Sequence, residues 1–392
     1  MRKLHALTLA CLLAPLLVAR AQDEEAATEE PSGGLTISGS VDTYVRGIIG
    51  AERDWAPPTA FANKNGVALG MVNLVIAKEG EKAGFVADLV YGPRGADAVF
   101  LSVGSASIVN QLYAYWKVND ALRLTLGNFN TFLGYEVISP VGNFHYTTSY
   151  MFSYGPFSHT GLRADLAITE QFSAMLAVMN PTDFTEFNPA STYTLGAQLG
   201  YVADAGSAFL NVVYGDQDGA VNRNKELVKT TILGGDTAIS SKPQFQIDLS
   251  TGWNLTDAFY LGLNTSYNIV TGAKLYAASI DGASIEETTS GVTNGYWGIA
   301  LYPRYTVTDV FALGLRGEYF SEFEGGFGVI GAYDPSGSAD VLALTLSGNI
   351  KAGDLTLIPE IRMDHYSRKV VPDKVGAGNM GVSALLAAVY AF

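Results

Sequence analysis

The sequence predicts an all-β protein: a transmembrane, antiparallel, up-and-down β-barrel of about 16 strands, within a range of about 14–18. Three observations support this fold class. Of 392 residues, 48% are hydrophobic and only 16% are charged, with 43 Gly, 21 Tyr and 19 Phe, whereas soluble domains have about 25% charged residues. No run of roughly 18 apolar residues follows residue 21, so no helical span is expected. Apolar and polar residues instead alternate in runs of about ten residues, the length with which a strand crosses a bilayer.

The chain divides into three parts. Residues 1–21 have the features of a secretory signal peptide, with Arg2 and Lys3 before an apolar core and a small-residue cleavage site ending at Ala21. Residues 22–34 are acidic and end in Pro, Ser and Gly, which is typical of a flexible periplasmic tail. Residues 35–392 are expected to form the barrel in the outer membrane of a Gram-negative bacterium.

Charge and cysteine content exclude several classes. The signal holds three of the 24 basic residues and none of the 38 acidic ones, so the mature chain has 21 basic residues and a net charge of −17. This charge argues against a nucleic-acid partner. The single cysteine, Cys11, lies within the signal, so the mature protein has no disulfide. A lipoprotein signal with Cys11 as the lipidated residue is disfavoured, because the apolar region before it would be too short.

Sixteen alternating runs are predicted to be strands. Seven tight polar turns join them in pairs, and eight longer connections lie between the pairs, as in an outer-membrane barrel with short periplasmic turns, long outer loops and both chain ends in the periplasm. The predicted strands are 35–47, 67–78, 83–92, 108–118, 121–128, 158–168, 171–180, 193–203, 207–215, 244–254, 258–268, 295–306, 310–320, 340–350, 354–364 and 383–392. The longer connections are 48–66, 93–107, 129–157, 181–192, 216–243, 269–294, 321–339 and 365–382.

The alternation assigns side chains to two faces. In 340–350, for example, Leu342, Leu344 and Leu346 are expected to face lipid, and Thr345 and Ser347 the interior. We therefore expect Leu344→Arg to cost about 2–4 kcal/mol, and Thr345→Arg to cost little and to alter ion selectivity. A soluble β-sandwich also alternates with period two. The length of the runs and the aromatic residues at their ends favour the barrel.

The first and last strands are expected to pair, because an open edge in hydrocarbon leaves backbone groups without partners. Val41 and Val45 should then face lipid, and Asp42 and Arg46 the interior. The chain ends on an aromatic residue with a second one two positions earlier, which resembles the sorting signal of outer-membrane barrels. The resemblance implies recognition by the barrel assembly machinery, with Tyr390 and Phe392 as the signal residues.

A barrel of 16 strands is wide enough for an aqueous lumen. Inward-facing charges of both signs could polarise the water of a channel for small hydrophilic solutes. They could equally form ion pairs that brace the wall. The candidates are Arg46, Arg123, Arg163, Arg304, Arg316 and Arg362, with Asp42, Asp165, Asp248, Glu318, Glu360 and Asp364.

Residues 129–157 form the longest irregular, aromatic-rich insert between two strands, and inserts of this size are usually functional. It is the third long outer loop, and in general porins the third outer loop folds into the lumen and narrows it. By this analogy Glu136 and His145 would line the narrowest point. The alternative is a lid that closes the mouth, which would make the protein a plugged barrel acting as a surface adhesion or structural scaffold.

The same stretch carries a family resemblance. The order and spacing of nine residues resemble the second, OmpL-like class of beta-barrel porins, and they implied an outer-membrane channel but no particular solute. These residues are Gly127, Asn128, Gly134, Glu136, Asn143, Ser149, Pro156, His159 and Gly161. The resemblance covers about 35 residues, and the rest of the chain matches the class only in its pattern.

Other functions are disfavoured. Asn143, His145 and Ser149 lie in one loop with no strand to fix them, so they are a weak candidate for hydrolysis and no enzyme activity is expected. Three scattered His and no Cys in the mature chain make a transition-metal site improbable, and no cofactor is expected. Residues 216–219 match half of a calcium loop and are better interpreted as an exposed turn. Outer-membrane lipid is the expected surrounding, and homo-oligomerisation is left open.

Overall fold

The computed structural model describes residues 34–49, 51–52, 54–102, 104–188, 192–215, 237–240, 244–278, 285–373 and 376–392, with the backbone alone at 237–240, 271–278, 285–292 and 373. The predicted signal peptide, nearly all of the acidic tail and residues 216–219 lie outside these ranges. In the described part of the chain, no helix is long and apolar enough to cross a membrane.

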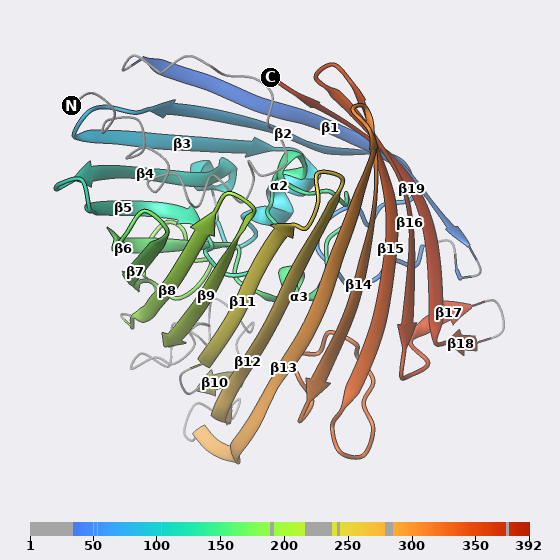
Figure 1. Ribbon diagram of the computed structural model, residues 1–392. Helices are drawn as coiled ribbons and strands as arrows, with labels where there is room; N and C mark the ends of the chain where they lie inside the picture. The colour runs from blue at the N-terminus through green and yellow to red at the C-terminus, as the bar shows by residue number, and fades with distance from the viewer. Residues whose placement is uncertain are drawn as a thin grey trace.

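Sixteen antiparallel strands form a closed barrel, as predicted (Figure 1). They are β1 (Leu35–Ile49), β2 (Gly66–Lys78), β3 (Ala83–Tyr91), β4 (Val109–Lys117), β5 (Leu122–Asn130), β6 (Ser158–Ala167), β7 (Phe172–Met179), β8 (Thr194–Ala203), β9 (Gly206–Gly215), β11 (Gln244–Asn254), β12 (Phe259–Ala278), β13 (Ile285–Thr308), β14 (Phe311–Phe323), β15 (Ala339–Ala352), β16 (Leu355–Tyr366) and β19 (Met380–Ala391).

Short elements lie outside or inside this ring. The strand β10 (Thr237–Ser240) pairs with β12 beyond the end of β11, and β17 (Val371–Asp373) pairs with β18 (Gly376–Gly378). The helical segments are α2 (Pro93–Ala98), η2 (Gly104–Ile108), η3 (Pro140–Gly142) and α3 (Tyr150–Tyr154). Figure 1 shows α2 and α3 within the ring of strands.

The barrel closes where the sequence required it. β1 pairs with β2 on one side and with β19 on the other, with Val41 opposite Tyr390. The amide of Gly39 donates to the carbonyl of Phe392 at 2.9 Å, and the amide of Phe392 donates back at 3.0 Å. The last residue thus completes the ladder, and the backbone groups of both terminal strands are satisfied without water.

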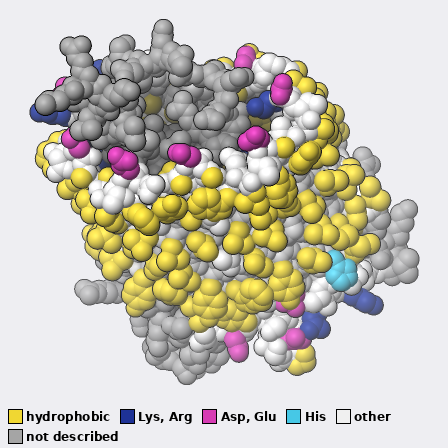
Figure 2. All heavy atoms as spheres, viewed as in Figure 1, with side chains coloured by type: hydrophobic (Ala, Val, Ile, Leu, Met, Phe, Trp, Pro, Cys, Tyr) yellow, Lys and Arg dark blue, Asp and Glu magenta, His cyan; other side chains and the backbone are white. Residues whose placement is uncertain are grey.

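The two faces of β1 are as predicted. Val41 and Val45 are 46% and 43% exposed, whereas Asp42 and Arg46 are each 3% exposed. Figure 2 shows the consequence on one side of the barrel: a band of hydrophobic side chains crosses the visible face, and acidic side chains lie along its upper border. This band is the lipid-contacting surface expected of a transmembrane barrel.

One predicted connection is wrong. Residues 269–294 were expected to form an outer loop, but β12 continues to Ala278 and β13 begins at Ile285. The prediction recognised a strand by its apolar face. A hairpin that extends beyond the lipid needs no apolar face, so it was not recognised. The β-branched residues Thr288, Thr289 and Val292 favour an extended backbone there.

Substitutions in β15 test the facing of the wall. We expect Leu344→Arg, near the middle of the outward face, to lower the free energy of unfolding by about 2–4 kcal/mol in denaturant titrations in lipid vesicles. Leu344→Met, which keeps the side chain apolar, is the control. An equal effect of both variants would contradict the assignment of this face to lipid.

The structure overturns the expectation that Thr345→Arg costs little. Thr345 is fully buried, and its Oγ1 accepts a hydrogen bond from Arg316 Nη2 at 3.0 Å. A second guanidinium at this position would adjoin Arg316 with no additional carboxylate to pair with it. We therefore expect Thr345→Arg to be destabilising as well, through the interior rather than through lipid.

Candidate functional site

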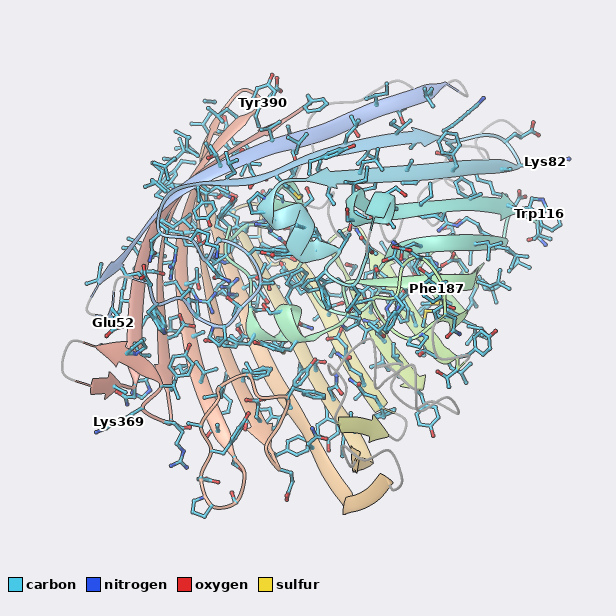
Figure 3. The ribbon with its side chains drawn as sticks, turned by 180° about the vertical axis from the view of Figure 1, so that it is seen from behind. Glu52, Lys82, Trp116, Phe187, Lys369 and Tyr390 are labelled. Atoms are coloured by element: carbon cyan, nitrogen blue, oxygen red, sulfur yellow. The ribbon has the colours of Figure 1, made fainter. Side chains whose placement is uncertain are left out.

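Residues 131–157, called the inserted loop below, leave the end of β5 and return to the start of β6. The first two residues of the predicted insert, 129 and 130, belong to β5. The amide of Thr131 donates to the carbonyl of Phe157 at 2.9 Å, which joins the two ends of the loop. Between them the loop enters the barrel, where its helix α3 lies in the interior (Figure 3).

Carboxylates of the wall bind the backbone amides of the inserted loop. Glu318 of β14 accepts from two successive amides, and Glu360 of β16 and Asp248 of β11 each hold another part of the loop. The bonds are Tyr150 N and Met151 N to Glu318 at 2.8 Å each, Tyr146 N to Glu360 at 2.9 Å and Gly134 N to Asp248 at 2.8 Å. The irregular backbone of the loop needs such acceptors, because its amides are buried away from water.

Two arginines of the wall bind its carbonyls. Arg316 of β14 donates to the carbonyl of Thr147 at 2.6 Å and forms an ion pair with Glu136 of the loop at 2.6 Å. Arg362 of β16 donates to the carbonyl of Thr148 at 2.8 Å and pairs with Asp364 at 2.8 Å. The wall thus presents both donors and acceptors that match the loop backbone.

Glycines of the wall provide space for the large side chains of the loop. A Cβ atom at any of four inward glycines would lie well inside van der Waals contact of one loop side chain. These pairs are Gly196 with Phe132 at 2.6 Å, Gly262 with Tyr135 at 2.6 Å, Gly298 with Met151 at 2.7 Å and Gly314 with Phe144 at 2.3 Å. These glycines were not among the predicted site residues. The only signal for them in the sequence was a glycine at an inward position of a strand.

The nine residues of the family resemblance build the loop and its base. Asn143 bridges the amide and carbonyl of Val137, at 2.9 and 2.6 Å, and the Oγ of Ser149 accepts from the amide of Phe152 as the N-cap of α3. Glu136 joins Arg316 to the amide of Ser149.

The other residues of the resemblance lie mainly at the base of the loop. Gly127 is paired with Gly161 in neighbouring strands, and Asn128 donates to the carbonyl of Asn110. His159 lies 3.0 Å from Thr131. Gly134 has φ +85°, and Pro156 follows α3.

Comparison with known proteins gives the family. The sequence profile described as "Putative beta-barrel porin-2, OmpL-like" matches residues 34–392. The chain belongs to this family. It is an outer-membrane porin, as the resemblance of residues 127–161 implied. A search of curated proteins gave no match.

Solved structures agree on the fold of this porin. The outer-membrane channel DcaP of Acinetobacter baumannii is 14% identical and superimposes with a TM-score of 0.55, over 94% of this chain and 100% of that one. In-vitro folded OmpT of Vibrio cholerae is 11% identical, with a TM-score of 0.55 over 94% and 100%. At such identities the likeness concerns the fold alone.

The structure places six of the predicted inward charges against the inserted loop or its anchors. They point to the interior as expected, but they contact protein rather than open water. Their exposed fractions are 0% for Arg316 and Glu318, 1% for Arg362 and Asp364, 2% for Asp248 and 3% for Glu360. These six charged residues therefore do not face one another across open water. They brace the wall and the loop, the alternative that the sequence left open.

Asp42 and Arg46 of β1 are also bound by protein groups. Asp42 accepts from the amide of Met71 at 3.1 Å, and Arg46 donates to Asn65 at 2.9 Å. His145, expected at the narrowest point, is 3% exposed, and its Nδ1 lies 2.7 Å from Ser347 Oγ of β15. Its ring therefore packs against the wall, because the loop turns this side chain outward from the barrel axis.

Two charged residues on the wall of β5 and β6, Arg123 and Asp165, are partly exposed. Asp165 of β6 lies 3.4 Å from Arg123 of β5 and 3.0 Å from Arg163. The side chains of Asp165 and Arg123 are 24% and 16% exposed. Asp165 thus pairs with both arginines, and its partial exposure and that of Arg123 allow them to face a solvent path.

Asp183, in the connection between β7 and β8, fixes the end of the inserted loop. Its carboxylate accepts from the amides of Phe157 and Ser158 at 2.8 Å each. Burial raises the pKa of Asp183 to about 7, against the two hydrogen bonds, which favour the charged form. The sequence analysis did not identify this residue, because nothing local links it to the loop.

Other outer segments also pack inside this porin. Arg94 of α2 donates to the carbonyl of Ile138 at 2.8 Å and lies 4.3 Å from the ring centre of Phe61. Phe61 belongs to an apolar cluster with Phe152 and Phe157 of the inserted loop. The interior is therefore partly apolar, because aromatic side chains of the inserted loop and of Phe61 pack together there.

A cavity of about 920 Å³ lies under the inserted loop, at the end of the barrel with the tight turns. Asn143 and Phe144 of the loop form one boundary. Arg304 of β13, Lys351 of β15 and the terminal Phe392 contribute from the wall. Because tight turns are periplasmic in outer-membrane barrels, we call this cavity the periplasmic vestibule.

Proposed function

We propose that this porin is a water-filled channel for the passive diffusion of small hydrophilic solutes, and that the inserted loop constricts it. The observation that carries the proposal is the anchoring of the loop inside a barrel of 16 strands by Arg316, Glu318 and Glu360, above an open vestibule. A loop held at fixed depth narrows the lumen without relying on its own stability.

The path is proposed to pass the wall of β5 and β6. Arg123 and Asp165 keep partly exposed side chains there, whereas the charges of β14 and β16 are occupied by the loop. A wall with an accessible acid and an accessible base suits hydrated solutes of either sign. In this proposal the residues expected to line the pore act in two groups, one facing the path and the other positioning the loop.

Planar-bilayer recording of the refolded full-length barrel tests the channel. We expect discrete, long-lived single-channel openings with ohmic current at low voltage, because the loop is fixed by many buried bonds and leaves a constant cross-section. A mock sample of detergent carried through the same refolding is the control. Absence of any stepwise current at all tested voltages would refute the channel.

The burial of the inserted loop favours one alternative. Thr148 and Tyr150 are fully buried and Ser149 is 1% exposed, as in a protein core. A loop packed so tightly could close the lumen, and the barrel would then serve as a surface adhesion or structural scaffold. Deletion of the loop separates these functions and is developed in the Discussion.

A catalytic role is not proposed. The three polar residues that resembled a hydrolase set each have a structural partner: Asn143 binds Val137, His145 binds Ser347 and Ser149 caps α3. Their side chains are thereby committed to the loop and wall.

Assembly of this porin remains a proposal in three respects. We propose that residues 1–21 direct export, with residues 22–34 as a periplasmic tail. We propose that Tyr390 and Phe392, 46% and 54% exposed on the outer face, form the signal for the barrel assembly machinery. Homo-oligomerisation is proposed because one structure of the similar OmpT of Vibrio cholerae is described as a trimer form.

A further inference from the structure

We propose that the periplasmic vestibule binds small organic carboxylates with an apolar body, and that Arg304 is the residue that holds the carboxylate. The proposal deepens the proposed function, on which it rests for the access of solutes from the periplasm. It is argued from the missing partner of one arginine, the rigidity of its surroundings and the lining of the cavity.

Arg304 differs from the other inward arginines. Arg123 and Arg163 pair with Asp165, Arg316 with Glu136 and Arg362 with Asp364, and Arg46 and Arg94 donate to carbonyl groups. In the described part of the chain, Arg304 has neither an ion pair nor a hydrogen bond. Its guanidinium lies over two aromatic rings instead, 4.5 Å from the centre of Tyr260 and 5.7 Å from that of Phe144.

Stacking leaves the donor edge of this guanidinium available. A guanidinium that lies over aromatic rings still has its N–H groups in its own plane, where they can form two parallel hydrogen bonds. A carboxylate matches this fork with both oxygens. Because Arg304 lines the vestibule, a carboxylate in the cavity can approach it.

The two rings that contact Arg304 are held by their own neighbours. The hydroxyl of Tyr135 donates to that of Tyr260 at 2.8 Å, and Tyr135 stacks on Tyr302 with ring centres 4.1 Å apart. Phe144 lies over Gly314, where a Cβ would be 2.3 Å from its ring. An arginine that stacks on fixed rings is ordered before a ligand binds, so its side chain loses less conformational entropy on binding.

The residues that line the cavity indicate the chemistry of the rest of the ligand. Its volume of about 920 Å³ is within the range of small-molecule sites. Apolar side chains cover part of the surface, so a ligand with an apolar body fits better than a bare inorganic anion. They are Val141, Phe144, Val310, Phe311, Ile358 and Val389.

Two acids line the cavity, but they lie at its rim. Asp309 and Asp354 are in the tight turns after β13 and β15, and Lys351 lies close to Asp354 in sequence. Asp309 is five residues from Arg304 along an extended strand, a separation of about 16 Å. This exceeds the Debye length of about 8 Å at physiological salt, so Asp309 does not cancel the attraction of an anion to Arg304.

Binding of benzoate tests the proposal directly. Calorimetric titration of the full-length porin in an uncharged maltoside detergent should show saturable binding of benzoate and none of benzamide, its neutral counterpart. Arg304→Gln should weaken benzoate binding at least tenfold. Arg368→Gln, which alters an arginine in an outer loop paired with Asp334, should leave it unchanged. Equal affinity of the wild type and Arg304→Gln for benzoate would overturn the proposal, and so would binding of phosphate in preference to benzoate.

A second measurement uses the wild-type protein and so does not depend on folding of the variant. Phenylglyoxal modifies accessible arginines, and mass spectrometry of peptides gives the rate at each one. Benzoate should slow modification of Arg304 severalfold and leave Arg368 unaffected; an unchanged rate at Arg304 would refute the site. Both measurements are independent of current, so carboxylate binding without conductance would refute the channel alone, and conductance without binding would refute the site alone.

Discussion

Deletion of residues 136–154 is expected to raise the single-channel conductance of this porin about two- to fivefold, because the lumen of a 16-stranded barrel is wide once no loop fills it. The barrel should still fold, since its ladder of strands from β1 to β19 is continuous without the loop. The residues that anchored the loop, Glu318, Glu360 and Arg316 among them, would then face water, where an ionised group carries no burial cost.

The deletion has three informative outcomes in planar bilayers. An existing current that grows identifies the inserted loop as a constriction, as proposed. A current that appears only after deletion identifies it as a plug and supports the scaffold alternative. An unchanged current would mean that the loop lies outside the path. An equally long deletion, 216–234 between β9 and β10, serves as the control for the loss of an outer segment.

Arg316→Met is expected to lower the free energy of unfolding by about 3–5 kcal/mol, because it leaves the carboxylate of Glu136 buried without its cation. Arg316 is fully buried, and the side chain of Glu136 is 3% exposed. The carbonyl of Thr147 also loses a donor at 2.6 Å. Unfolding in urea, followed by tryptophan fluorescence in vesicles, measures the change.

Two further variants separate the charge effect from the loss of packing. The double variant Glu136→Gln with Arg316→Met should recover part of the stability, since a neutral amide replaces the unpaired charge. Arg368→Met breaks an ion pair with Asp334 whose side chains are 35% and 30% exposed, and should cost less than about 1 kcal/mol. If Arg316→Met and Arg368→Met had the same effect, the buried pair would not be what holds the loop.

The inserted loop illustrates how far the sequence could be interpreted. Its length and aromatic content indicated an ordered insert, and the order of Gly127, Glu136, Asn143 and Ser149 indicated the family. The contacts of Glu136 were not predictable, because its partner Arg316 lies 180 residues away. An inward arginine on a strand has the same local pattern whether it faces water or a loop.

The glycines of the wall and Arg304 make the same point. Gly314 was an unremarked inward residue until Phe144 was seen to lie over it. Arg304 was expected to be one of many charges in the lumen. The structure shows that, among the inward arginines of the described residues, Arg304 alone contacts aromatic rings without an ion pair or hydrogen bond, because the acids nearby are paired with other arginines. Under the proposals made above, solute selectivity would depend on the charges that are not bonded to the loop.

By itself the sequence predicted the barrel: about 16 strands within a range of about 14–18, their two faces, the closure of the first strand on the last and the outer-membrane class. These features follow from period-two alternation over bilayer-length runs and from the need to pair every backbone group in lipid, and both are local properties that a single chain displays. Only the tertiary structure decided what fills the lumen and which charged residues are without an ion pair. Pairing between distant residues depends on where the loop folds, and the alternation of residues along a strand does not indicate where that is.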